Sequence, residues 1–217
     1  MQKIKNFIKN EKMFVISISL LFIGNGLMYW LIKLFQSNPI YIDFYLDDKI
    51  PFWGWLVYIY NMFYPFCFLA FYLIYRKDKK AYYKGIISGI IGCIISNIIF
   101  LIIPTIMYRP VTPNYDPFTN FLIKVTFFFD EPPLNCFPSL HCIFCFQVIF
   151  SYLKSKCTLK RKSWIIICST LIILSTLFVK QHYIYDVISA LIVCIMANCL
   201  ESVLMIYERL KLKIKKI

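Results

Sequence analysis

Six long apolar stretches alternate with polar segments along the chain. A helix needs about 20 apolar residues to cross the hydrocarbon core of a bilayer, and each stretch reaches or approaches that length. The pattern therefore predicts an all-α, polytopic membrane helical bundle that forms a single domain over residues 1–217. The six predicted transmembrane spans cover residues 13–35, 53–75, 83–103, 137–153, 163–179 and 183–207.

Composition supports a membrane protein. Hydrophobic residues make up 60% of the chain and aromatic residues 19%, whereas soluble domains contain about 45–50% apolar residues. The chain begins with a charged segment followed by an apolar run, which is the order found in a signal sequence. Because that run is too long and no small-residue cleavage site follows it, we interpret it as a retained first span.

The basic residues predict an orientation in the membrane. All but five of the 24 lysines and arginines lie in the two terminal segments and in the second and fourth connections. Since cytoplasmic segments of membrane proteins carry an excess of basic residues, both termini are predicted to be cytoplasmic. The net charge of +13 then reflects topology and attraction to anionic lipid, and we expect no nucleic-acid partner. The opposite side receives the loop 36–52 and the proline-rich loop 104–136, which we expect to be irregular.

The nine cysteines lie mostly in apolar stretches, where a cysteine acts as a small hydrophobic residue. Cys142 and Cys145 are separated by two residues, but no second pair of ligands accompanies them. We therefore predict buried cysteines and no metal site.

Both histidines of the chain stand where an apolar stretch begins. His141 belongs to NCFPSLHC at 135–142, and His182 belongs to KQHYIYDV at 180–187. If the second segment is helical, His182 and Asp186 are four residues apart and share a face. A carboxylate at the edge of a membrane helix is costly unless it is paired or lines a polar cavity. A His–Asp pair fixes the imidazole tautomer and raises its basicity, which suits catalysis.

The charge-derived topology places His141, His182 and Arg109 on the same, non-cytoplasmic side. Ser139 is a natural N-cap before the fourth span, where free backbone N–H groups can hold an anion, and the Arg109 guanidinium matches phosphate oxygens. With phosphate held there, a neutral histidine can attack phosphorus while a protonated one donates to the leaving oxygen. Each residue alone has a structural explanation, as an interfacial side chain, a hydrogen-bonded pair or a cap. Their common placement favours catalysis.

Three segments resemble known motifs in order and in spacing. YRP at 108–110, FPSLH at 137–141 and HYIYDV at 182–187 resemble the motifs of the type 2 phosphatidic acid phosphatase superfamily, which also includes vanadium haloperoxidases. The resemblance implies a helical core, six spans and a metal-independent phosphate-ester reaction that proceeds through a phosphohistidine.

The resemblance also implies a role for each motif residue. His182 would be the nucleophile, Asp186 its orienting partner, and His141 the acid for the leaving group. Arg109 and Ser139 would bind the phosphate.

The chain departs from the phosphatase pattern at three places. Ile102 stands where a lysine usually precedes the motif arginine by seven residues, Leu140 replaces a glycine, and Ser175-Thr176 replace a Ser-Arg pair. Two phosphate-binding cations are therefore missing, and Lys180 is the predicted substitute. In these departures the chain is more similar to the branch of inositol phosphosphingolipid and sphingomyelin synthases. LDDKIPF at 46–52 also resembles the first outer loop of bacterial members of that branch.

We therefore expect a lipid phosphatase in the plasma membrane of a bacterium, with its active site on the extracytoplasmic side, a membrane lipid as substrate and no cofactor. A lipid head-group phosphotransferase is the alternative within the enzyme class, and a non-catalytic phospholipid-binding membrane protein is the alternative outside it. The aromatic run Phe127–Phe129 could hold acyl chains or form an interfacial belt, and we favour the belt. Opposite protonation of the two histidines predicts a bell-shaped pH profile.

Overall fold

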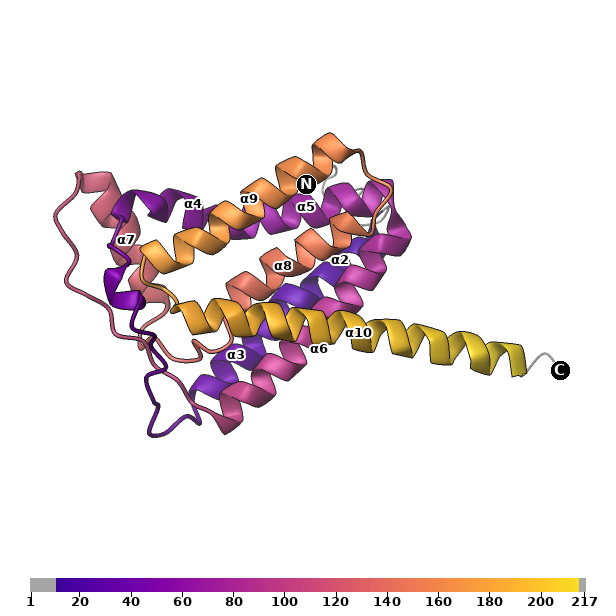
Figure 1. Cartoon of the computed structure of the whole chain (residues 1–217), viewed down its shortest axis with the longest axis horizontal. Helices are drawn as coiled ribbons and strands as arrows, with labels where there is room; N and C mark the ends of the chain where they lie inside the picture. The colour runs from indigo at the N-terminus through magenta and orange to yellow at the C-terminus, as the bar shows by residue number, and fades with distance from the viewer. Residues whose placement is uncertain (1–10, 215–217) are drawn as a thin grey trace.

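The apolar stretches form helices in the computed structural model, which describes residues 11–214 and the side chains of residues 11–207 (Figure 1). The all-α fold class is confirmed, since the elements in the described part of the chain are all helical. The α-helices are α2 (Lys12–Ser19), α3 (Asn25–Lys33), α4 (Val57–Asn61), α5 (Phe63–Lys77), α6 (Lys79–Ile102), α7 (Pro117–Phe129), α8 (Leu140–Leu153), α9 (Leu159–Phe178) and α10 (Ile184–Ile214). A π-helical turn, η1 (Leu20–Gly24), joins α2 to α3, and the 3-10 turns η2 (Asp47–Lys49) and η3 (Gly54–Leu56) precede α4.

Five of the six predicted spans correspond to helical segments that are long and apolar enough to cross a membrane. These segments are Lys12–Lys33, Gly54–Lys77, Lys79–Ile102, Leu159–Phe178 and Ile184–Tyr207. The fourth predicted span is shorter than expected, because α8 begins only at Leu140 and contains 14 residues. At 1.5 Å per residue it is about 21 Å long. Residues 137–139 stay outside the helix because Pro138 precedes the N-cap Ser139.

The proline-rich loop is more regular than predicted, because it contains the helix α7. The Asp116 carboxylate accepts hydrogen bonds from the N–H groups of Phe118 and Thr119, and Pro117 occupies the first helical position. A side-chain N-cap followed by proline is a strong helix start, and an apolar run continues from it. The expectation of an irregular loop over residues 104–136 was therefore wrong for its middle part.

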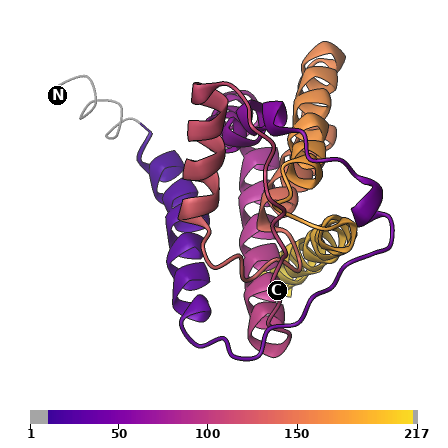
Figure 2. The ribbon, with the colours of Figure 1, turned by 90° about the vertical axis from the view of Figure 1, so that its left-hand side faces the viewer.

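Helix α6 lies at the centre of the bundle, where it packs against α8 and α10 (Figures 1 and 2). Close approach depends on small residues on its inner face. At Gly85 a Cβ atom would collide with the side chain of Ser151 on α8. The absence of a side chain at this position therefore sets the distance between the two helices.

The outer faces of the spans remain apolar, as a lipid-exposed surface requires. Ile23 and Leu27 on the first span are 62% and 69% exposed, for example. The cysteine prediction holds for most positions, because seven of the nine are buried. It was wrong for Cys199, which is exposed on α10, and Cys168 is half-buried on α9. Cys199 lies on a helix face that the rest of the bundle leaves exposed, and Cys168 lies on one that is partly covered.

The two short basic connections lie together at one end of the bundle. The Asp78 side chain caps α6 by accepting from the Ala81 N–H and also accepts from the Lys156 N–H, 3.0 Å away. The long loops gather at the opposite end, on the left in Figure 1. The basic residues 3, 5, 9, 215 and 216, and the side chains of residues 209, 211 and 213, lie outside the described part.

Candidate active site

The predicted His182–Asp186 pair is present. His182 Nδ1 lies 3.3 Å from Asp186 Oδ2, and Asp186 is 1% exposed. Because a carboxylate only accepts, Nδ1 carries the hydrogen, which leaves the lone pair on Nε2 of the neutral ring. The reason differs from the predicted one: α10 begins at Ile184, so His182 precedes the helix. The same carboxylate oxygen accepts from the Tyr183 N–H at 2.8 Å and so holds the turn before the helix.

His141 occupies the first turn of α8 and faces His182, with 5.7 Å between the ring centroids. Its Nε2 is 3.1 Å from the Tyr60 hydroxyl, and the Phe63 ring packs against it with a centroid distance of 4.5 Å. Tyr60 and Phe63 come from α4 and α5 and were missed in the sequence, because aromatic residues in an apolar stretch give no signal of a polar site.

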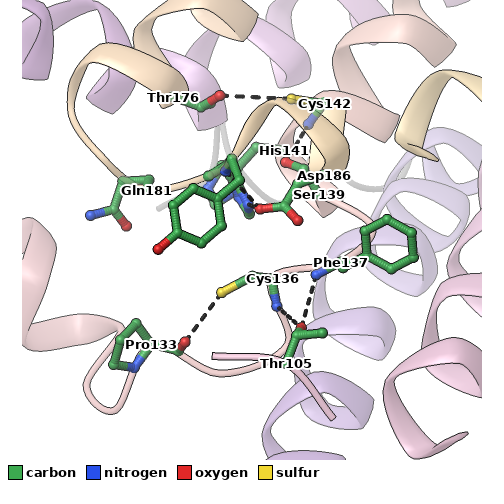
Figure 3. Close-up of polar contacts among 12 residues, drawn as sticks. Thr105, Pro133, Cys136, Phe137, Ser139, His141, Cys142, Thr176, Gln181 and Asp186 are labelled. Atoms are coloured by element: carbon green, nitrogen blue, oxygen red, sulfur yellow. Dashed lines mark hydrogen bonds and ion pairs between the residues drawn. The ribbon is translucent and has the colours of Figure 1, made fainter. Parts of the chain in front are cut away.

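Ser139 is the N-cap that the sequence predicted. Its Oγ accepts from the Cys142 N–H at 3.2 Å, and its side chain is fully buried. Its own N–H donates to the Asp186 carbonyl oxygen at 3.1 Å. Ser139 therefore fixes the start of α8 against the start of α10 (Figure 3).

Further backbone contacts join the motif segments. The Thr105 hydroxyl accepts from the N–H groups of Cys136 and Phe137, as Figure 3 shows. The Tyr108 N–H donates to the Tyr183 hydroxyl at 3.1 Å. Segments from three distant parts of the chain thus converge at one end of the bundle, as the charge pattern predicted.

The loop 36–52 contributes a cap that the sequence did not reveal. Asp47, which is 4% exposed, accepts from the Ile184 N–H at 2.9 Å through Oδ1. It thereby caps α10 from more than 130 residues away along the chain. A carboxylate at a helix start satisfies free N–H groups and complements the helix dipole. The local signal was an acidic pair, Asp47-Asp48, whose partner only the fold could identify.

Arg109 contacts Gln181, the residue before His182, and both of its terminal nitrogens are held by protein groups. Nη2 forms an ion pair with Asp130 Oδ2 at 2.7 Å, and Nη1 is 3.3 Å from Glu131 Oε2. Nη1 also donates to the Phe127 carbonyl oxygen, and Nη2 donates to Gln181 Oε1 at 3.4 Å. Asp130 is a site residue that sequence reasoning missed, although an acid directly after a run of phenylalanines could have marked it.

Lys180 is not brought to the two histidines. Its Nζ donates to the Asp47 carbonyl oxygen at 2.7 Å, and its backbone is left-handed, with φ of 52°, where α9 ends. Burial lowers the pKa of its ammonium group, while Asp47 and Asp48 act in the opposite direction. Its position gives no support to the phosphate-binding role predicted for it.

A cavity of about 400 Å³ joins the histidines to an aromatic wall. Its polar end contains His141, His182, Asp130, Asn135 and Gln181. Its apolar wall is built mainly from aromatic side chains of the first two spans and of α7 and α8, namely Phe22, Tyr29, Trp30, Phe63, Tyr64, Phe129 and Phe144. The cavity can therefore hold a molecule that is polar at one end and apolar at the other.

Within the part of the chain that has described side chains, no group of three or more His, Cys, Asp or Glu residues is placed to hold a metal ion.

Comparison with known proteins gives one family. The model of the family described as the PAP2 superfamily matches residues 40–200, which include all three motifs. A search of curated proteins and a search of solved structures gave no match.

Proposed function

The chain belongs to the PAP2 superfamily, and from this premise we propose that it is a metal-independent membrane lipid phosphatase. It hydrolyses a lipid phosphate or diphosphate ester at the non-cytoplasmic face through a phosphohistidine. The observation that carries the proposal is the placement of His182, oriented by Asp186, opposite His141 at the polar end of the cavity.

The reaction balances with these side chains and one water molecule. The lone pair of His182 Nε2 attacks phosphorus while the bond from phosphorus to the leaving oxygen breaks. Protonated His141 donates to the leaving oxygen, so that a lipid alcohol leaves from a monophosphate ester, or a lipid monophosphate leaves from a diphosphate ester, and a phosphohistidine remains. Neutral His141 then removes a proton from water, whose oxygen attacks phosphorus while the bond from phosphorus to His182 Nε2 breaks, and inorganic phosphate is released. The Asp186 carboxylate stabilises the positive charge that forms on the His182 ring.

The side chains that line the cavity support a lipid as substrate. An aromatic wall beside the polar end accommodates apolar chains, because burial of apolar surface is favourable. Phe129 lines this wall although it is 67% exposed, and Phe128 is 76% exposed. The aromatic run of α7 thus contributes one side chain to the cavity, and for Phe128 the interfacial belt remains our expectation.

A head-group phosphotransferase is the second candidate. The departures at Ile102, Leu140 and Ser175-Thr176 favour it. Ile102 is 71% exposed at the end of α6, so it contributes nothing to phosphate binding. In this reaction a lipid alcohol replaces water as the group that attacks the phosphohistidine.

The test is phosphate release by the full chain, purified in detergent with EDTA, from dioleoyl phosphatidic acid and from an isoprenyl diphosphate. We expect release that persists in EDTA and is abolished by His182→Ala. Lys124→Ala, which changes an exposed residue of α7, is the control and should retain activity. Release that continues in His182→Ala would refute the proposed nucleophile.

The same preparation separates the alternatives. Loss of the phosphate donor only when a second lipid with a free hydroxyl group is added would identify a transferase. Binding of the donor without turnover under either condition would identify a lipid-binding protein.

A further inference from the structure

The two terminal nitrogens of the Arg109 guanidinium group are occupied by protein oxygens in this structure, whereas its Nε is buried and has no hydrogen-bond partner among the described residues. Both terminal nitrogens contact protein oxygens, and the shortest contact is the 2.7 Å ion pair with Asp130. The Arg109 side chain is 10% exposed. An anion that binds the terminal nitrogens of Arg109 must therefore displace a carboxylate that is already there.

Asp130 stands between Arg109 and the cavity. It lines the cavity together with both histidines, whereas Arg109 is not among the described residues that line it. Its second oxygen, Oδ1, accepts from the Tyr29 hydroxyl at 2.7 Å. Burial raises the pKa of the Asp130 carboxyl group, while Tyr29, Arg109, Lys33 and His182 act in the opposite direction. The charged form of Asp130 thus depends on its protein partners.

Lys33 supplies a second possible partner. It lies in the last turn of α3, one turn after Tyr29, and is 8% exposed. Its Nζ lies 4.7 Å from the centroid of the Trp30 ring and has no hydrogen-bond partner among the described residues. A buried ammonium group without a partner is costly, so a carboxylate that approaches it is stabilised.

We propose that Asp130 is an internal anion that pairs with Arg109 in the empty site and moves to Lys33 when a phosphate group takes its place. The proposal rests on the proposed function, because it specifies how the same site accepts phosphate. In the empty site Arg109 is paired and Lys33 is not, whereas in the occupied site both cations are paired. Lys33 therefore performs the charge-balancing role of a cation that the motifs lack.

The two possible roles of Asp130, competition with phosphate and orientation of Arg109, predict opposite effects of its removal on the affinity for phosphate. If Asp130 only oriented Arg109, its removal would weaken phosphate binding. If Asp130 competes with phosphate, its removal strengthens binding, since the cost of breaking the ion pair disappears.

The first experiment measures binding of inorganic phosphate to the full chain in detergent by calorimetry. We expect Asp130→Asn to lower Kd by about tenfold, which corresponds to about 1.4 kcal/mol. The matched control is Glu131→Gln, because Glu131 also contacts Arg109 but is 65% exposed, and an exposed ion pair contributes little. An unchanged or raised Kd in Asp130→Asn would overturn the proposal, as would an absence of phosphate binding in every variant.

The second experiment tests Lys33 through a double-mutant cycle. Lys33→Met should raise the Kd for phosphate in the wild-type background and leave it unchanged in the Asp130→Asn background, because the displaced carboxylate is then absent. Equal effects in both backgrounds would overturn the transfer to Lys33. If Asp130→Asn fails to fold, Lys33→Met alone decides, since unchanged or tighter binding contradicts the proposal.

Activity measurements separate this inference from the proposed function. Tighter phosphate binding by Asp130→Asn without any lipid phosphate hydrolysis by the wild type would leave the exchange standing and refute the phosphatase. Hydrolysis by the wild type with no gain of phosphate affinity in Asp130→Asn would refute the exchange alone.

Discussion

At the residue scale, the two histidines differ in the partners that surround them. His182 contacts a buried carboxylate, which favours a nucleophile because it stabilises the charged ring that forms during attack. His141 contacts the Tyr60 hydroxyl, a neutral partner of the same chemical kind as a leaving alcohol. The two environments therefore support the different roles that the motif resemblance implied.

The leaving-group role of His141 predicts a dependence on the substrate. In His141→Gln we expect kcat for a lipid phosphate to fall by about 10²–10⁴-fold, the usual contribution of a general acid. The loss should be much smaller for an aryl phosphate such as p-nitrophenyl phosphate, because its leaving oxygen needs no proton. His182→Ala should lose both activities. Equal losses on both substrates in His141→Gln would show that His141 does not protonate the leaving group.

The same roles predict the pH dependence of kcat/KM. Activity should fall at low pH, where His182 gains a proton and loses its lone pair, and at high pH, where His141 has no proton to donate. The profile between about pH 5 and 9 should therefore be bell-shaped when chemistry is rate-limiting. In His141→Gln the high-pH limb should disappear while the low-pH limb remains. A monotonic wild-type profile would contradict the two opposite roles.

At the element scale, the sequence predicted well what depends on local pattern. The Ser139 cap and the long spans follow from a capping residue and from continuous apolar runs. Helix α7 was missed because the prolines around it outweighed its apolar run. The position of Asp130 after the phenylalanine run could have marked it as a candidate, but its partner and the role of Tyr60 depend on contacts with segments far away in the chain. Lys180 was predicted to bind phosphate because it is close to His182 in sequence. The end of α9 instead directs its side chain towards Asp47.

The packing of α6 against α8 predicts a stability effect at Gly85. Gly85→Ala places a methyl group against Ser151, and overpacking of this kind costs about 1–3 kcal/mol. We expect a lower midpoint of thermal unfolding in detergent, and Ser151→Ala in the same chain should restore part of it. Gly26→Ala is the control, since a Cβ there meets nothing within 4 Å. A loss in Gly26→Ala equal to that in Gly85→Ala would show that helix contact is not the cause.

At the scale of the whole molecule, the short basic connections and the loops that build the cavity lie at opposite ends of the bundle. The short basic connections meet at Asp78, whereas the loops that build the cavity meet at the opposite end. Because the excess of basic residues marks the cytoplasmic side, the fold predicts that the cavity opens on the other side of the membrane. We therefore expect a phosphate ester to reach the histidines from the non-cytoplasmic side.

This topology predicts which parts of the chain can be labelled from outside intact cells. An epitope inserted beside Val111, which is 93% exposed in the loop after α6, should bind antibody without permeabilisation. A tag added after residue 217 should bind only after permeabilisation. The reverse pattern would place the histidines on the cytoplasmic side, and labelling of both tags in intact cells would mean that an even number of segments cross the membrane between Val111 and the carboxyl terminus. That last result would single out α8, because its 14 residues make it the shortest of the helices expected to span.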